Sequence, residues 1–172
     1  MPTLTTKHLI LRLPHKDDFD LFAALWGDAD MLKDLPFEPQ TRAESWPRFL
    51  RLAGSWALLE YGTWFVFDKA GGFVGLVGFM NALRGHGPDF DDHPELNCVL
   101  SPAHMGKGYA TEACLAALAW MDQQSFGSHT VCLIASEHTA SIRVAEKCGY
   151  KVLRNVKSAK ELAVLMTRNC PV

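Results

Sequence analysis

The chain has 172 residues, 48% of them hydrophobic and 21% charged, which is the composition of an ordinary globular domain with enough length for one substantial core. Its formal net charge of -2 provides no broad basic field and excludes nucleic acid as the expected main partner. No apolar run is long enough to cross a bilayer and no secretory signal pattern opens the chain, so we expect a cytoplasmic protein without membrane association, folded as a single domain over residues 1–172.

The first part of the chain is expected to form a strand followed by two helices. The strand covers residues 9–13, and a helix over residues 17–26 begins with Asp17 or Asp18 as its capping residue. The second helix is predicted at residues 42–59, where apolar side chains recur at helical spacing. Together these two helices are expected to form a helical shoulder.

A hairpin is the strongest signal in the middle of the chain. Residues 64–67 and 73–79 are rich in aromatic and β-branched side chains, and residues 68–72 carry the glycines of a turn between them. A loop at residues 84–94, rich in Gly, Pro, His and Asp, then leads to a strand predicted at residues 95–100.

The remaining chain alternates helices and strands. From Ala110 onward the apolar residues keep the spacing of an amphipathic helix. The other predicted elements are a strand at 130–135, a helix at 139–148 and two strands at 150–156 and 162–167. This order combines a hairpin with a βαβα unit, and it predicts an α+β (mixed α/β) domain with a mixed sheet.

The five cysteines are odd in number and lack Cys-x-x-Cys spacing, which argues against a disulfide framework and against a zinc site. We expect no metal, also because His86 and His93 have no compact ligand spacing around them. Four cysteines fall within apolar patterns, where cysteine usually behaves as a small buried hydrophobe. These are Cys98, Cys114, Cys132 and Cys148.

The segment from Met105 to Glu112 is a glycine-punctuated loop that runs into the start of a helix. Gly106 and Gly108 permit backbone angles that let successive N–H groups point at an anion, and the first helical turn adds unpaired donors and a favourable dipole. The segment lacks the Walker pattern, and Thr111 stands where the dinucleotide fingerprint requires its third glycine. It therefore predicts either a pyrophosphate site built from backbone amides or a tight strand-to-helix connection.

With these elements in order, the chain resembles the GNAT superfamily of acyl-CoA-dependent N-acyltransferases, within it the RimJ/RimL-like group that includes the ribosomal-protein-alanine acetyltransferases. The resemblance rests on the segments at residues 9–12, 95–100, 106–113 and 139–150. It implies a central, mostly antiparallel mixed and twisted sheet of about six or seven strands flanked by about four helices. It also implies acetyl-CoA (coenzyme A) as co-substrate and a primary amine, either a protein N-terminus or a small molecule, as acceptor.

The resemblance assigns the cofactor to the glycine loop, to the strand before it and to the start of the last helix. By analogy, the pyrophosphate lies on the loop amides and the pantetheine extends the sheet beside the strand. The implied cofactor-binding residues are Cys98, Val99, Leu100, Met105, Gly106, Lys107, Gly108, Tyr109, Ala110, Thr111, His138 and Ser141. Met105 replaces the usual Gln or Arg, and His138 replaces a common Asn. Lys107 fits either a phosphate contact or a solvated loop lysine.

Acyl transfer to an amine needs an uncharged nitrogen, a stabilised oxyanion and a proton for the departing thiolate. The resemblance implies Glu95 as the base, directly or through water, although a solvated or ion-paired carboxylate fits the sequence too. Oxyanion stabilisation is expected from a main-chain N–H near Val99. The family's usual proton-donating tyrosine aligns with Ala145, which leaves Ser141 as proton donor or as a capping or buried serine. Tyr150 is expected in the core.

The acceptor side carries the weakest motifs. Asp89, Asp91 and Asp92 fit either a solvated loop or a surface that attracts a cationic amine. The protein is expected to be a monomer or a homodimer. A non-catalytic acyl-CoA-binding module is the alternative to an enzyme, and a phosphate-loop nucleotide hydrolase is disfavoured because the Lys-Ser/Thr pair is missing.

Overall fold

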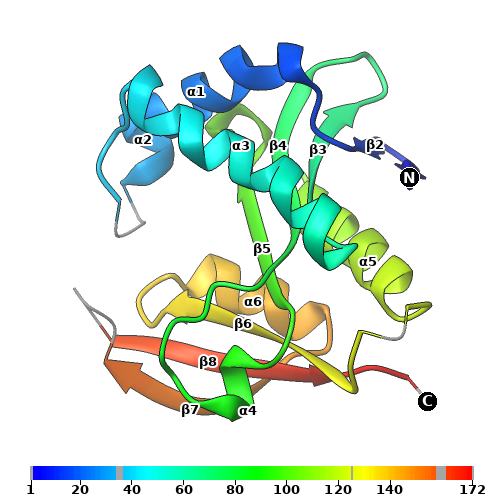
Figure 1. The fold of residues 1–172 in the computed structure, drawn as a ribbon, viewed down its shortest axis with the longest axis vertical. Helices are drawn as coiled ribbons and strands as arrows, with labels where there is room; N and C mark the ends of the chain where they lie inside the picture. Colours follow the sequence, from blue (N-terminus) through cyan, green and yellow to red (C-terminus); the bar gives the residue numbers. More distant parts are fainter. Residues whose placement is uncertain (1, 34–36, 125, 158–161, 172) are drawn as a thin grey trace.

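The computed structural model describes residues 2–33, 37–124, 126–157 and 162–171, and within them the chain forms one eight-stranded sheet with six α-helices (Figure 1). The strands are β1 (Leu4–Thr5), β2 (Leu9–Arg12), β3 (Thr63–Asp68), β4 (Phe73–Met80), β5 (Glu95–Leu100), β6 (His129–Ala135), β7 (Lys151–Lys157) and β8 (Leu162–Asn169). The helices are α1 (Phe19–Gly27), α2 (Ala29–Leu32), α3 (Arg42–Leu59), α4 (Pro88–Asp91), α5 (Tyr109–Met121) and α6 (Thr139–Lys147), with 3-10 turns η1 (Lys16–Asp18) and η2 (Pro102–His104).

The sheet has the strand order β1-β2-β3-β4-β5-β6-β8-β7. All neighbouring strands are antiparallel except β5 and β6, which are parallel. The last strand in the sequence, β8, lies between β6 and β7, so the C-terminal hairpin is inserted with its second strand innermost. The mixed α+β architecture predicted from the order of elements is confirmed.

Helices cover both faces of the sheet. One face, called here the shoulder face, is covered by α1, α2 and α3 over β3 and β4 and by α4 over β6 and β8 (Figure 1). The opposite face carries α5 and α6 and is called the α5/α6 face. Each face therefore has its own apolar core. The side chains of β5 alternate between the two faces, so this strand contributes to both cores.

Local sequence explains the shoulder. A capping box starts α3, because the Thr41 hydroxyl accepts the N–H of Glu44 and the Glu44 carboxylate accepts the N–H of Thr41. The expected cap of the first helix differs in detail: His15 caps the 3-10 turn η1, and Asp18 accepts the His15 N–H and an ion pair from Arg12 at 2.6 Å. This ion pair between Arg12 of β2 and Asp18 of η1 connects the shoulder to the sheet.

The sheet is split at its centre. Strand β5 pairs with β4 along its whole length, from Glu95 to Leu100, but its register with β6 is a single parallel pair, Glu95 with Val131. Beyond that pair the two strands diverge toward their C-terminal ends, and Figure 1 shows the gap between them. One edge of β5 therefore lies open inside the molecule.

The structure has slightly more elements than the sequence predicted. The sheet has eight strands rather than six or seven, and six α-helices rather than four flank it. The additional elements are β1, of two residues, and α2 and α4, of four residues each. Elements this short carry no readable periodicity, because one turn of helix or two strand residues do not repeat a pattern. Within the described residues, none of the helices has both the length and the apolar character required to cross a membrane.

Candidate active site

The side chains of β5 alternate between the two faces of the sheet. Leu96 and Leu100 pack in the core of the α5/α6 face, and Cys98 lies against that core. Val99 packs against the shoulder cluster instead, which places Glu95 and Asn97 on the shoulder face as well. A ligand in the split would thus meet β5 side chains of two different sets, one on each face.

The main chain at the open edge of β5 is available for hydrogen bonding. Ser101 N–H donates to a β4 carbonyl at 2.9 Å, which makes Leu100 a member of a non-hydrogen-bonded pair of the antiparallel ladder. Alternation then turns the N–H and C=O of Val99 toward β4, and those of Cys98 and Leu100 toward β6. No described residue of β6 pairs with these two, so the free main-chain N–H groups near Val99 are those on either side of it.

The glycine loop forms a cradle of free amides at the same end of β5. Gly106 and Gly108 have φ values of 74° and 80°, in the left-handed region, and a Cβ built on either would meet no atom within 4 Å. Among the described residues, the N–H groups from 106 to 111 have no hydrogen-bond acceptor, and Gly108 is the N-cap of α5. The cradle therefore combines empty space, orphan donors and the positive end of a 13-residue helix.

Glu112 anchors this helix start to the N-terminal strands. Its carboxylate accepts the Thr6 hydroxyl at 2.6 Å, and the His8 N–H and Nδ1 at 2.7 Å each. Burial alone would raise the pKa of Glu112, but these hydrogen bonds outweigh it and lower the pKa from 4.5 to about 2. The carboxylate is thus engaged by Thr6 and His8 and fixes the first turn of α5 to the N-terminal strands.

The start of α6 forms the other wall of the split. His138 is its N-cap but makes no side-chain capping bond, and the half-buried Ser141 hydroxyl has no partner among the described residues. Ser141 shares a helical face with Ala145 and Cys148, which are buried against the core of the α5/α6 face. Ala145 supplies no proton, which makes the Ser141 hydroxyl the unengaged donor on this face.

Glu95 is buried and paired. It is 4% exposed, and both of its carboxylate oxygens accept hydrogen bonds of 2.8 Å from Arg84, one from Nε and one from Nη2. Hydrogen bonding to Glu95 raises the pKa of Arg84. The carboxylate lies at the closed end of the split, where β5 meets Val131 of β6. Its surroundings are those of an ion pair, one of the two readings that the sequence left open.

Asn97, one step along β5 from Glu95 on the same face, was not singled out by the sequence. Its side-chain amide donates to the Gly78 carbonyl at 3.0 Å and lies 3.4 Å from the Thr63 hydroxyl. Strand alternation alone would have placed Asn97 with Glu95. Arg84 carried no such signal, because it lies in an irregular loop and reaches Glu95 only through the tertiary fold.

Two of the thiols behind the split, Cys114 and Cys132, are unsuited to nucleophilic attack. The Cys114 thiol hydrogen-bonds Cys148 and Cys98, and these bonds with burial raise the pKa of Cys114 well above its ordinary value. Burial also raises the pKa of Cys132. The prediction of buried cysteines is confirmed for Cys114, Cys132 and Cys148, whereas Cys98 is half-buried.

The acidic loop before β5 is a structural unit. Asp91 accepts the N–H groups of Arg84 and Gly87, and Asp89 pairs with Arg154 of β7 at 3.0 Å. Asp92 remains exposed at the surface. Two of the three aspartates thus have structural partners within the protein, and no ligand is needed to explain them. The same contacts hold in place the loop that carries Arg84, the partner of Glu95.

Other candidates fall into the core or outside the site. Tyr150 is 3% exposed and its phenol bonds the Thr130 hydroxyl at 2.7 Å, which confirms its expected core position. His93 faces His129, with ring centroids 3.7 Å apart, and the described residues contain no group of three potential metal ligands. Trp26 is buried in the shoulder, whereas Trp46 is 40% exposed.

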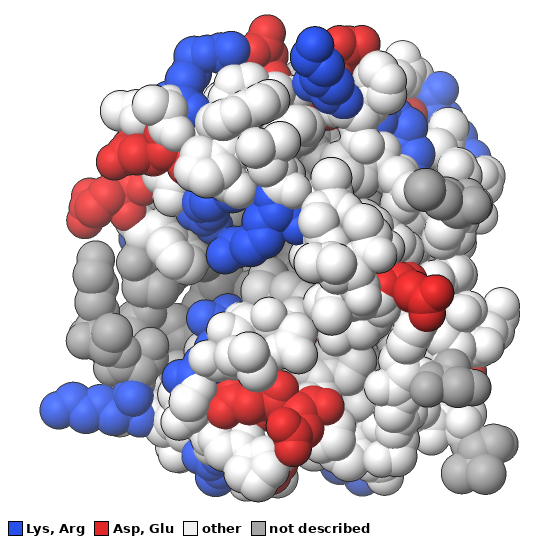
Figure 2. Space-filling view, viewed as in Figure 1, with Lys and Arg blue, Asp and Glu red and all other residues white. Residues whose placement is uncertain are grey.

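The shoulder face of β5 opens to the surface between the shoulder and α4. Figure 2 shows this side of the molecule hollowed there, with Lys and Arg side chains along the shoulder edge and acidic side chains gathered below. The amide cradle and α6 belong to the opposite face. The split is thus reached from two sides, as a reaction between a long anionic donor and a separate acceptor requires.

Comparison with known proteins points the same way. The family model described as Acetyltransferase (GNAT) domain matches residues 8–151. A GnaT-family acetyltransferase from Bordetella pertussis has 30% sequence identity and a TM-score of 0.89, with 98% of this chain and 99% of that chain covered. A search of curated proteins gave no match.

Two more distant structures share the fold. RimL, the ribosomal L7/L12 alpha-N-protein acetyltransferase in complex with coenzyme A, has 14% identity and a TM-score of 0.82, with 98% of both chains covered. Spermidine N-acetyltransferase from Vibrio cholerae, in complex with CoA and spermine, has 17% identity and a TM-score of 0.75, with 96% of this chain and 97% of that chain covered. One of these relatives acts on a protein and the other on a polyamine.

Proposed function

Since the chain belongs to the GNAT family of acetyltransferases, and is an acyl-CoA-dependent N-acyltransferase of the RimJ/RimL-like kind, we propose that it transfers an acetyl group from acetyl-CoA to a primary amine by direct attack in a ternary complex. The observation that carries this proposal is the open edge of β5 beside a cradle of unpaired amides. Main-chain N–H and C=O groups inside a protein are nearly always paired. The lack of partners among the described residues, both at the edge of β5 and in the glycine loop, therefore supports a ligand that pairs with both.

The site fits coenzyme A in shape and charge. The amides from Gly106 to Thr111 and the start of α5 would hold the pyrophosphate, because they present donors without a Cβ in the way. The main chain of Cys98 and Leu100 would pair with the amides of the pantetheine as an added strand does. Lys107 is exposed beside the cradle and would add a point charge. His138, the N-cap of α6, would lie beside the bound pantetheine.

Acetyl-CoA, when bound, supplies an acetyl group activated as a thioester. The N–H group of Cys98, which lies nearer to Glu95, would then stabilise the charge that develops on the carbonyl oxygen during attack, and the C=O of Cys98 with the main chain of Leu100 would remain for the pantetheine. Glu95, on the acceptor side of β5, would take the proton from the amine directly or through water, with Arg84 holding the carboxylate in place. The Ser141 hydroxyl would donate a proton or a hydrogen bond to the departing sulfur.

Direct transfer is favoured over a covalent enzyme intermediate by the state of the thiols. A nucleophilic cysteine needs a lowered pKa and access, whereas Cys114 and Cys132 are buried with raised pKa values, and Cys148, whose pKa is lowered by its hydrogen bond with Cys114, is buried as well. The amine would therefore attack the acyl carbon itself, entering from the shoulder face.

Calorimetry and a thiol-release assay test the proposal together. Titration with coenzyme A should give a saturable heat, and incubation with acetyl-CoA and a panel of amines should release free thiol for at least one acceptor. Binding without turnover on any acceptor would instead identify a non-catalytic acyl-CoA-binding module. Absence of binding in folded protein would remove the cofactor assignment itself.

A further inference from the structure

Arg48 of α3 is a guanidinium held by aromatic rings rather than by a carboxylate. Its guanidinium carbon lies 3.8 Å from the ring centroid of Trp26 and 5.4 Å from that of Phe37. Among the described residues no carboxylate lies within ion-pair distance of Arg48, or of Arg51 one turn further along α3. Partial burial, with a contribution from Arg51, lowers the pKa of Arg48.

This arrangement is unusual within the chain. Arg48, Arg51 and Arg143 have no carboxylate at ion-pair distance among the described residues, whereas the other five of the eight arginines have one at 2.6 to 3.0 Å, including one on the same helix as Arg48. That one, Arg42, also covers an aromatic ring, Phe19 at 4.8 Å, but is paired with Asp20 at 2.6 Å. A desolvated cation beside a second cation is unfavourable unless an anion joins them.

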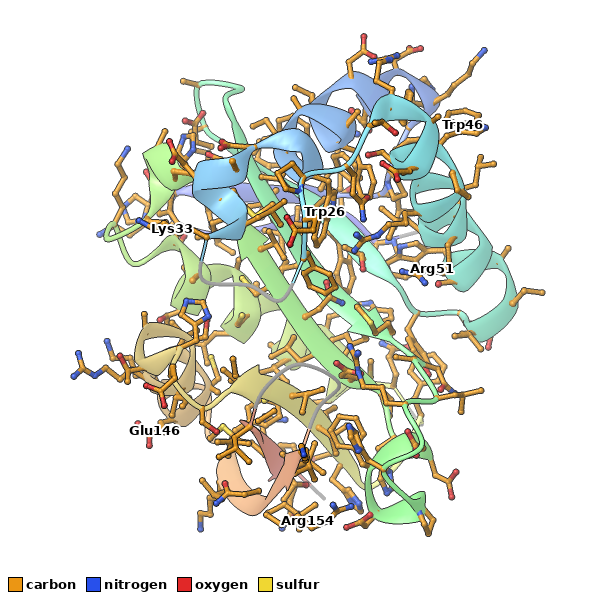
Figure 3. The ribbon with its side chains drawn as sticks, turned by 90° about the vertical axis from the view of Figure 1, so that its left-hand side faces the viewer. Trp26, Lys33, Trp46, Arg51, Glu146 and Arg154 are labelled. Atoms are coloured by element: carbon orange, nitrogen blue, oxygen red, sulfur yellow. The ribbon has the colours of Figure 1, made fainter. Side chains whose placement is uncertain are left out.

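Packing connects Arg48 to the reacting end of β5. Trp26, which it covers, belongs to the same core cluster as Val99, between the two main-chain donors of the split. Figure 3 shows Trp26 and Arg51 on the shoulder, with Arg154 at the far end of the molecule. The basic edge of the hollow seen in Figure 2 therefore borders the side from which the acceptor would enter.

The cations on the opposite side of this opening are already neutralised. Arg84 is paired with Glu95 and Arg154 with Asp89. Arg48 and Arg51 thus supply positive charge without an ion-pair partner among the described residues on the shoulder side of the opening, opposite the acidic side chains below it (Figure 2). A polyamine would be repelled by these two arginines. An acceptor that carries a carboxylate would instead meet the planar guanidinium of Arg48, whose orientation is already fixed by stacking on an aromatic ring.

We propose that Arg48, with Arg51 beside it, binds a carboxylate of the acceptor, so that the enzyme selects molecules carrying both an amine and a carboxylate. This inference rests on the proposed acetyl transfer and names its acceptor class. The carboxylate belongs to a free amino acid or to a peptide, and the chemistry recognised is the same in both. Trp26 and Phe37 orient the guanidinium, and the fork of Arg48 makes the contact.

Matched acceptors test this proposal. Thiol release is measured with amino acids and their amides, with dipeptides and their C-terminal amides, and with spermidine. In the native enzyme, kcat/KM should be about tenfold or more higher for the acid than for the amide of each pair, with spermidine the poorest acceptor. The free amino acid and dipeptide arms separate the two sources of the carboxylate.

Arg48→Gln should bring the acid-to-amide ratio of kcat/KM close to one, mainly through a higher KM for the acid, while the affinity for acetyl-CoA stays unchanged. Arg48→Lys should keep part of the preference, because it retains the charge but not the fork. Arg42→Gln is the matched control, since it removes an arginine from the same helix and from a similar aromatic contact, and it should leave the ratio intact.

The outcomes are distinguishable. Equal use of acid and amide by the native enzyme, preference for spermidine, absence of turnover on every acid, or an unchanged ratio in Arg48→Gln would each overturn the inference. If Arg48→Gln does not fold, Arg51→Gln and Arg48→Lys must lower the ratio, or the inference fails. Absence of acetyl-CoA binding in calorimetry would refute the proposed function instead, whereas binding with turnover on amides and polyamines would leave that function standing and refute only the acceptor class.

Discussion

Glu95 and Arg84 form a two-point ion pair at the closed end of the split, with both nitrogen–oxygen distances at 2.8 Å. The carboxylate is 4% exposed, and the loop that carries Arg84 is itself held by Asp91. A base in this position is oriented by its partner before the amine arrives. The pair therefore links the shape of the loop before β5 to the proton transfer that we propose.

Glu95→Gln should lower kcat about 100-fold, because the amide cannot take a proton, while the affinity for acetyl-CoA stays within about twofold. Steady-state kinetics and calorimetry measure the two quantities. The control is Asp122→Asn, which breaks another two-point pair, with Arg168 at 2.6 and 2.8 Å, at the far end of α5. Comparable loss of activity in both variants, or none in Glu95→Gln, would rule out Glu95 as the base.

Gly108→Ala should weaken coenzyme A binding about tenfold or more, because its Cβ would occupy the space in which the cradle receives a phosphate. The added left-handed strain should lower the free energy of unfolding by about 1 kcal/mol. Gly71→Ala is the matched control: Gly71 has φ of 87°, no atom within 4 Å of a built Cβ, and lies in the β3–β4 turn. Equal cofactor affinity in both variants would contradict the loop assignment.

Ser141→Ala should reduce kcat at least about tenfold with little change in stability, since the hydroxyl has no protein partner among the described residues. Tyr150→Phe should behave in the opposite way. It removes a buried hydrogen bond to Thr130 and should lower the unfolding free energy by about 1 kcal/mol without a loss of activity. Full activity of Ser141→Ala, or inactivity of a folded Tyr150→Phe, would reverse these assignments.

Glu112 should make stability depend on pH in the acid range. Its pKa is lower in the folded state, about 2, than the ordinary value of 4.5, so its contribution is present above about pH 5 and is lost as the pH falls toward 2. Because the carboxylate is partly exposed, we expect roughly 1 to 2 kcal/mol. Denaturant unfolding of the native protein and of Glu112→Gln should show a difference at pH 7 that shrinks below pH 5. A difference that is constant from pH 7 to 2 would exclude this linkage.

The sequence was sufficient to predict the helices and strands that are long enough to show a repeating pattern of apolar side chains. The helix predicted at residues 42–59 is confirmed as α3, and a capping box of Thr41 and Glu44 marks its start. The strand predicted at residues 95–100 is confirmed as β5. The insertion of β8 between β6 and β7 could not be predicted, since order along the chain does not specify neighbours in a sheet.

For the site, the sequence indicated the cradle but not the charges around it. The positive φ values at Gly106 and Gly108 are conformations that glycine adopts readily, so the geometry of this loop could be predicted from the sequence. The partner of Glu95, and the lack of a carboxylate beside Arg48 among the described residues, depend on side chains brought together from distant loops and helices, and no local sequence pattern indicates them. The catalytic roles of Glu95 and Ser141 stay predictions until they are measured.

The split in the sheet has a further consequence for the protein without its ligand. An unpaired strand edge at a surface is a template for aggregation, because any extended chain can add to it. Here the exposed edge of β5, at Cys98 and Leu100, faces the interior, with α5 packed against it and α6 against β6. The molecule thereby offers an unpaired strand edge to a linear ligand within the split, and not along an outer edge of the sheet where a second sheet could add to it.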